Sequence, residues 1–298
     1  MRLPHPDSRA ALFAFALAAT LSLAPALAAP FTVVASFSVI GSLVSSVAGP
    51  DAAVVTLAPP NVDPHEFQPS TATARAASGA RLAFLNGLGL DDWAAALLAS
   101  VAPNAKIVRL AGGVTPRARP GLALDPHAWW DLRNARVYVN EIRDAMAAFD
   151  PAHRAGYAKR AAALDGRMRD LDAWALKAVA AIPAAKRVLV TNHDAFGYLA
   201  ARYGLRVVAT VFPGDATETE PTARETADLI DRLKASGARV IFSENTLPAK
   251  LAASIAAETG ARVAPGLYSD ALGAPGSGLN SFAAAFAHDI RVIVEALR

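Results

Sequence analysis

The 298-residue sequence contains no cysteine. This absence excludes disulfide-stabilised scaffolds, thiolate zinc fingers, iron–sulfur clusters, cysteine nucleophiles and any lipid anchor attached to a cysteine. Charged residues are also sparse, at 18% of the chain, which predicts long buried helices and strands. The 29 basic residues nearly balance the 26 acidic ones, and no basic run is present. The composition therefore predicts a protein that has no nucleic-acid partner.

The chain also has no apolar run of the roughly 20 residues needed to cross a bilayer. A shorter apolar stretch at 10–24 follows Arg2 and Arg9, and the small residues Ala26-Leu27-Ala28 come directly after it. A basic start, a short apolar segment and an A-x-A site are typical of a secretory signal peptide. We therefore predict cleavage after residues 1–28 and a soluble periplasmic protein without a lipid anchor, because a cysteine-free chain fits that compartment.

Short apolar runs alternate with helix-length segments along the rest of the chain. The alternation predicts an α/β fold with mainly parallel sheets, because parallel strands need helical crossovers and are buried on both faces. The candidate strands are Thr32–Ser36, Ala53–Leu57, Arg81–Leu85, Lys106–Leu110, Arg187–Thr191, Arg206–Val211, Arg239–Ser243 and Arg262–Ala264. The candidate helices between them are Val39–Val47, Asp91–Ser100, Thr222–Leu233 and Ala249–Glu258.

One long helical segment interrupts this alternation between the fourth and fifth strands. Asp150 and Pro151 have the types preferred at a helix N-cap and first turn, and no further proline occurs before Pro183. Apolar residues follow at helical spacing: Leu164, Met168, Leu171, Ala175, Val179 and Ile182. We predict two α/β lobes, residues 29–150 and 183–298, joined by a connector helix over 151–182.

Three of the six histidines lie where a ligand site is expected. His65, His127 and His193 each follow a predicted strand, and ligands in α/β sheets bind at the carboxyl ends of strands. His65 and His127 share an Asp-Pro-His tripeptide, in which the aspartate can accept the second ring N–H. Three imidazoles favour Zn²⁺, Cu²⁺ or Ni²⁺ over Ca²⁺ and Mg²⁺. The other three histidines are not expected to be ligands: His5, His153 and His288.

A fourth ligand is expected from the second lobe. Asp270 follows the eighth predicted strand, at the position equivalent to His127 in the first lobe, and three histidines with one aspartate can complete a zinc tetrahedron. From the chemistry alone, Asp270 has only a modest advantage over other acids in loops of the same lobe. These are Asp194, Asp215, Glu220 and Glu244.

The sequence contains no H-E-x-x-H, G-x-S-x-G, Walker A or dinucleotide-binding motif. No catalytic residue is therefore predicted. Two other functions remain open from the residues. One is an exported zinc hydrolase with Glu66 as general base, which requires that Asp270 is not a ligand. The other is an interaction module in which the metal is only structural.

The ordered motifs resemble those of the zinc/manganese substrate-binding proteins of bacterial ABC importers (cluster A-I) over nearly the whole mature chain. They are Asp63-Pro64-His65-Glu66-Phe67-Gln68-Pro69, Asp125-Pro126-His127-Ala128-Trp129, His193-Asp194-Ala195-Phe196-Gly197-Tyr198, Glu220-Pro221-Thr222, Phe242-Ser243-Glu244 and Leu267-Tyr268-Ser269-Asp270-Ala271-Leu272.

This resemblance implies a single metal between the lobes, bound by His65, His127, His193 and Asp270. It also implies a non-enzymatic monomer that delivers the ion to a membrane permease, with a periplasmic metallochaperone as a further candidate partner. Zinc is the preferred ion and Mn²⁺ the alternative, because manganese members tend to have a carboxylate where this chain has His193. Many zinc members carry a His-rich loop, whereas residues 112–124 contain neither histidine nor acid.

Overall fold

Two parallel four-stranded sheets form the centre of the computed structural model, which describes residues 31–119, 123–212, 217 and 221–298. The first sheet has the order β2-β1-β3-β4 and the second β6-β5-β7-β8, so the same topology occurs twice. All eight predicted strands are confirmed. Their bounds are β1 Phe31–Phe37, β2 Ala52–Ala58, β3 Leu82–Leu85, β4 Lys106–Arg109, β5 Val188–Thr191, β6 Arg206–Thr210, β7 Val240–Glu244 and β8 Arg262–Leu267. The predicted signal peptide, residues 1–28, lies outside the described residues.

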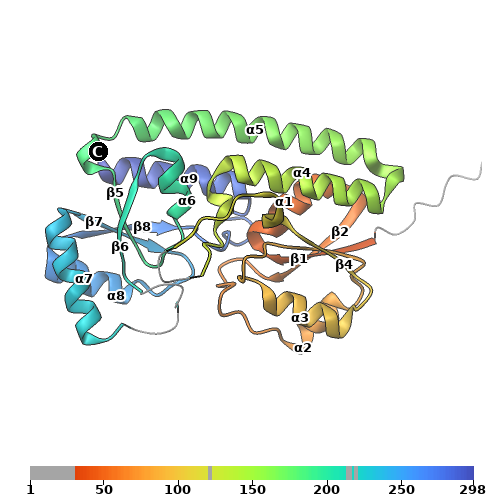
Figure 1. Ribbon diagram of the computed structural model, residues 1–298, viewed down its shortest axis with the longest axis horizontal. Helices are drawn as coiled ribbons and strands as arrows, with labels where there is room; N and C mark the ends of the chain where they lie inside the picture. Colours follow the sequence, from red (N-terminus) through yellow and green to blue (C-terminus); the bar gives the residue numbers. More distant parts are fainter. Residues whose placement is uncertain (1–30, 120–122, 213–216, 218–220) are drawn as a thin grey trace, which may run out of the picture.

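Helices cover both faces of each sheet, as the α/β prediction requires (Figure 1). The α-helices are α1 Ser38–Ala48, α2 Thr71–Ala77, α3 Asp92–Val101, α4 Leu132–Phe149, α5 Arg154–Ala180, α6 Gly197–Tyr203, α7 Ala223–Ser236, α8 Ala249–Thr259 and α9 Phe282–Leu297. Short 3₁₀ turns are η1 Gly49–Asp51, η2 Leu110–Gly113, η3 Ala128–Trp130, η4 Pro151–His153 and η5 Ala184–Lys186. The four predicted helices between strands correspond to α1, α3, α7 and α8.

The long helix α5 runs along one side of the molecule and extends over both sheets (Figure 1). Its 27 residues correspond to a length of about 40 Å. The helix differs from its prediction at the start, because Pro151–His153 forms the 3₁₀ turn η4 and α5 begins only at Arg154. Asp150 is the N-cap residue of η4, with Pro151 at the first position as predicted, but the α-helix itself begins three residues after Pro151. The Asp150 carboxylate accepts the hydroxyl proton of Tyr157 at 2.6 Å and lies 2.6 Å from Nδ1 of His153.

The predicted apolar stripe on α5 faces the protein interior. Five of its six residues are buried and Leu171 is partly buried. The stripe belongs to one apolar cluster that also contains residues of β1, α4, β5 and α9, so the two halves share a continuous core beneath α5. Separate clusters lie beneath α2 and α3 on the first sheet and beneath α7 and α8 on the second. A shared core opposes wide separation of the two halves, because separation would expose apolar surface to water.

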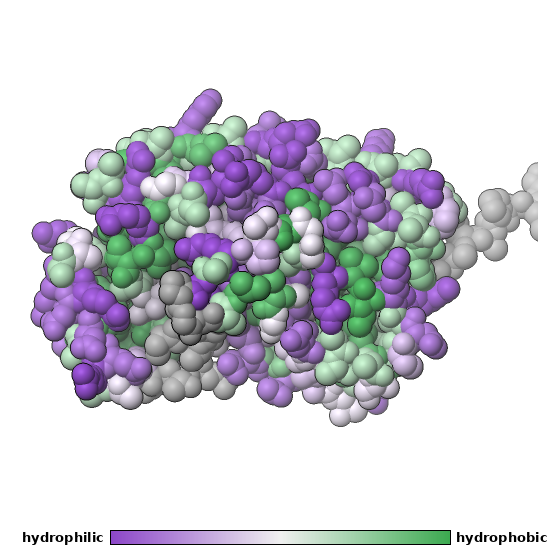
Figure 2. Space-filling model, viewed as in Figure 1, coloured by the Kyte–Doolittle hydropathy of each residue, from purple (hydrophilic) through white to green (hydrophobic). Residues whose placement is uncertain are grey.

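Hydrophilic and hydrophobic residues are interspersed on the face shown in Figure 2. Within the part of the chain that the structure describes, no helix combines the length and the apolar character needed to span a membrane.

Candidate metal site

The four predicted ligand residues converge between the two sheets. His65 lies in the segment after β2, His127 after β4, His193 after β5 and Asp270 after β8. One potential ligand atom from each residue lies within 4.8 Å of the others. The site therefore forms where the carboxyl ends of parallel strands meet, as the sequence predicted.

The distances between these atoms suit one small ion. His65 Nε2 is 3.2 Å from His127 Nε2, which is 3.4 Å from Asp270 Oδ1. His193 Nε2 is 2.8 Å from Asp270 Oδ2, and His65 Nε2 is 4.0 Å from that oxygen. A tetrahedral zinc ion with bonds of about 2.0–2.1 Å requires ligand atoms about 3.3 Å apart. The observed separations lie on both sides of that value, so the four residues are close enough together to share one ion.

The group is almost closed to solvent. The side chains of His127, His193 and Asp270 are at most 1% exposed, whereas that of His65 is 9% exposed. His65 is the most exposed of the four side chains, so the path for an ion that requires the smallest displacement of protein atoms passes beside it.

A carboxylate outside the group fixes the orientation of the His127 ring. Asp125 Oδ1 lies 2.9 Å from His127 Nδ1, which confirms the prediction for that Asp-Pro-His tripeptide. At the first tripeptide, Asp63 Oδ1 accepts the backbone N–H of His65 at 2.8 Å. The Asp125 contact selects the tautomer of the His127 ring that presents Nε2 to a metal, whereas the Asp63 bond positions the backbone of His65.

Glu244 is the functional contact that sequence reasoning did not identify. It was considered only as an alternative ligand, but its Oε2 lies 2.6 Å from Nδ1 of His193 and its Oε1 accepts the backbone N–H of His193 at 3.0 Å. Ser269 donates its hydroxyl proton to Oε2 of Glu244 at 2.7 Å. Glu244 therefore has the same relation to His193 that Asp125 has to His127.

The other acids considered as ligands do not belong to the four-residue group among the described residues. Asp194 lies 4.0 Å from Arg119. Glu66, considered as a general base, lines a hollow together with Asp63. Asp215 and Glu220 lie outside the described residues. The surface histidine His153 pairs with Asp150 at 2.6 Å, and the ring of His288 packs 5.5 Å from that of Tyr268.

The electrostatics of the group favour a bound cation. Burial alone would raise the pKa of Asp270, but the three neighbouring imidazoles outweigh burial and hold this pKa well below its usual range. Burial alone would lower the pKa of His193, but the carboxylates of Glu244 and Asp270 raise it well above its ordinary value. Asp270 is therefore ionised, and the protein favours a positive charge beside it, which either a proton or a metal ion supplies.

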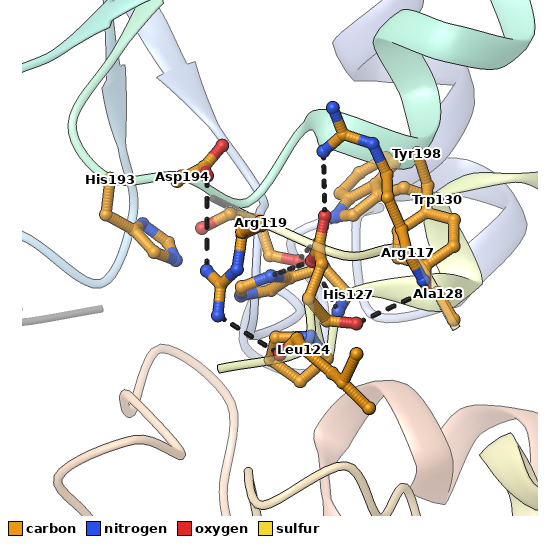
Figure 3. A network of polar contacts seen from close by, with 12 residues as sticks. Arg117, Arg119, Leu124, His127, Ala128, Trp130, His193, Asp194 and Tyr198 are labelled. Atoms are coloured by element: carbon orange, nitrogen blue, oxygen red, sulfur yellow. Dashed lines mark hydrogen bonds and ion pairs between the residues drawn. The ribbon is translucent and has the colours of Figure 1, made fainter. Parts of the chain in front are cut away.

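A second network holds the turn before His127 against the other half of the molecule. Tyr198 accepts the backbone N–H of Arg117 at 2.7 Å and donates to the backbone oxygen of Asp125 at 3.3 Å. The Arg117 guanidinium lies 3.3 Å from Oδ2 of Asp125. Figure 3 shows this network and the neighbouring Arg119, which donates to the backbone oxygen of Leu124. These contacts brace the carboxylate that orients His127.

Comparison with known proteins identifies close similarity to metal-binding proteins. The family description "Zinc-uptake complex component A periplasmic" (ZnuA) matches residues 33–296. The iron-binding protein YfeA of Yersinia pestis is 34% identical over 249 residues, which cover 81% of this chain and 78% of YfeA. The manganese-binding lipoprotein MntA of Halalkalibacterium halodurans is 28% identical over 266 residues, which cover 89% of this chain and 88% of that protein.

The solved structure of the periplasmic zinc-binding protein TroA from Treponema pallidum has the same fold. Its TM-score is 0.84 at 25% sequence identity, with 90% of this chain and 99% of TroA covered. The three similar proteins are thus named for iron, manganese and zinc. The comparisons define the family of the chain, whereas its preferred metal has to be argued from its own residues.

Proposed function

The chain belongs to the ZnuA family, the metal-binding substrate-binding proteins of ABC importers, and we propose that it captures one Zn²⁺ ion in the periplasm and delivers it to a membrane permease. The observation that carries this proposal is the convergence of His65, His127, His193 and Asp270 within 4.8 Å. These four residues bind the ion as cargo. The chain catalyses no reaction itself.

The donor set supports zinc as the preferred cargo. Three imidazole nitrogens and one carboxylate suit Zn²⁺, whereas Mn²⁺ favours sites richer in oxygen ligands. The four donor atoms, all within 4.8 Å of one another, are close enough to bind one ion together. Manganese and iron remain the competitors, because similar proteins are named for them.

The remaining features of the proposal come from the sequence. Residues 1–28 act as a signal peptide, and the mature chain is a periplasmic monomer without a lipid anchor. Residues 29–150 and 183–298 form its lobes, and 151–182 connect them. The permease is its membrane partner, and a periplasmic metallochaperone is a candidate donor of the ion.

Competitive titration of the mature protein tests the proposal. Protein stripped of metal is titrated with Zn²⁺ and with Mn²⁺ against a chromophoric chelator, and His193→Asp is titrated in parallel. We expect one tight zinc site, weaker manganese binding, and a shift toward manganese in His193→Asp. Tighter manganese binding by the unmodified protein would overturn the choice of metal. Absence of tight binding by either ion would overturn the proposed function.

A further inference from the structure

Two adjacent tryptophans pack into opposite halves of the molecule. The ring of Trp129 lies 5.4 Å from that of Phe37 in β1. The ring of Trp130 lies 5.0 Å from Phe196, which precedes α6, and 5.8 Å from Phe286 in α9. Both tryptophans are fully buried, at 0% and 1% exposure. The turn η3 therefore anchors the chain of the first half inside the core of the second.

Only one of these two indoles has a hydrogen-bond partner among the described residues. Trp130 Nε1 donates to the backbone oxygen of Ser269 at 3.2 Å, whereas no partner is found there for Nε1 of Trp129. Ser269 directly precedes Asp270, and Trp130 follows His127 by three residues. This buried hydrogen bond thus links the two turns that carry His127 in one half and Asp270 in the other.

The link continues to the remaining metal-site residue of the second half. The hydroxyl of Ser269 donates to Glu244, and Glu244 contacts Nδ1 of His193. Trp130 therefore contacts Ser269, which directly precedes Asp270. The side chain of Ser269 in turn supports Glu244, the carboxylate that orients His193. Separating the two turns would break the indole bond and leave the Ser269 carbonyl without that donor in a buried environment, which is unfavourable.

We infer that Trp130 is a positioning residue that holds the Asp270 turn against the His127 turn through its indole N–H and thereby slows metal release. This inference rests on the proposed metal-binding function. We call the hydrogen bond between Trp130 and Ser269 the clasp. It connects the two halves and involves none of the four residues around the metal. The bond is present while the turns are together and has to break when they separate, so it acts on dissociation more than on association.

Trp130→Phe and Trp129→Phe form a matched pair for testing the inference. Each replaces a buried indole with a smaller aromatic ring, but only Trp130→Phe removes a donated hydrogen bond. Zinc-loaded mature proteins are mixed with excess chelator by stopped flow, and association rates and thermal midpoints are measured alongside. We expect Trp130→Phe to release zinc about tenfold faster than Trp129→Phe, a ratio that corresponds to about 1.4 kcal/mol. Association rates should agree within about twofold, because the clasp acts after the ion is bound.

Equal release rates for the two variants would overturn the inference, and so would a Trp130→Phe effect confined to the association rate. An unmodified protein that binds no metal tightly would instead overturn the proposed function, so the two failures are distinguishable. Should Trp130→Phe fail to fold, hydrogen exchange of the assigned Trp130 indole N–H in the unmodified protein provides the test. We expect slower exchange in the zinc-loaded protein than in the metal-free protein. Equal exchange in both states would contradict the clasp.

Discussion

Glu244 contacts His193 twice, because one carboxylate oxygen lies 2.6 Å from the ring Nδ1 and the other accepts the backbone N–H at 3.0 Å. The ring is thereby fixed with Nε2 directed at Asp270, 2.8 Å away. Glu244 is itself 3% exposed and also accepts a hydrogen bond from Ser269. A buried carboxylate held in this way both selects the tautomer of the imidazole and increases its basicity toward a metal.

We predict that changing Glu244 weakens zinc binding without removing any of the four proposed ligands. Loss of such a supporting partner typically reduces metal affinity about 10–100-fold. Glu244→Gln keeps the side-chain volume and should fall near the lower end of that range, and Glu244→Ala near the upper end. Competitive chelator titration measures both. Glu258→Gln, an exposed change in α8, is the control and should bind zinc like the unmodified protein. Zinc affinity unchanged in Glu244→Ala would contradict an orienting role.

Zinc affinity should increase with pH through the neutral range. The pKa of His193 in the metal-free protein lies well above its ordinary value, because Glu244 and Asp270 outweigh the effect of burial. A raised pKa makes the His193 proton harder to remove, so zinc has to compete with that proton. Below the raised pKa, affinity should rise about tenfold per pH unit for one displaced proton, and above it the dependence should disappear.

Calorimetric titration of zinc at pH 7 in two buffers with different ionisation enthalpies counts the protons released. We expect release of about one proton from His193, and less as the pH increases. The control is His193→Asp, which removes the imidazole and should lose most of this release. Buffer-independent heats in the unmodified protein would show that His193 is neutral before zinc binds.

Removal of the metal should leave the protein folded. The continuous apolar core under α5 contains none of the four metal-site residues, so its burial does not depend on the ion. Zinc at about 1,000 times its dissociation constant should stabilise the folded state by about 4 kcal/mol, which corresponds to a thermal midpoint on the order of 10 °C higher. Thermal unfolding by circular dichroism, with and without chelator, measures this difference. Loss of the native spectrum on chelation at 25 °C would favour a structural metal instead.

Much of this architecture is local in origin and was therefore predictable. The β-strands are short Val- and Ile-rich runs, and the α5 stripe repeats at helical spacing, so neighbouring residues define both. His65, His127 and His193 could be grouped because each follows a strand, and parallel topology brings such ends together. The start of α5 was predicted three residues too early, because Pro151–His153 forms a 3₁₀ turn before the α-helix begins at Arg154.

The supporting contacts of the site depend on tertiary structure and were not predictable. Glu244 and His193 are 51 residues apart, and they meet because β5 pairs with β7. Trp130 and Ser269 are 139 residues apart and come from opposite halves. An isolated buried acid or tryptophan has no local spacing that identifies its partner, so only the folded structure reveals these roles.

Gly197, the first residue of α6, should be essential for the contacts that hold Asp125 against His127. A Cβ atom at Gly197 would overlap Nη1 of Arg117 and approach Oδ2 of Asp125 to 2.6 Å. Gly197→Ala should therefore displace the guanidinium and disturb the carboxylate that contacts Nδ1 of His127. We expect a loss of about 1–3 kcal/mol in folding stability and about tenfold weaker zinc binding. Chemical unfolding of the metal-free protein and zinc titration measure the two effects separately.

Two controls separate crowding from a general effect of the added methyl group. Gly79→Ala should change neither property, because a methyl group added there would meet no atom within 4 Å and the φ of Gly79 is not in the left-handed region. Arg117→Ala should relieve part of the crowding, so Gly197→Ala should cost less stability in that background than alone. If the stability loss of the double variant equals the sum of the two single losses, the added methyl group acts on Asp125 rather than on Arg117. In that case zinc affinity should fall equally with and without Arg117, because the carboxylate that orients His127 is displaced directly.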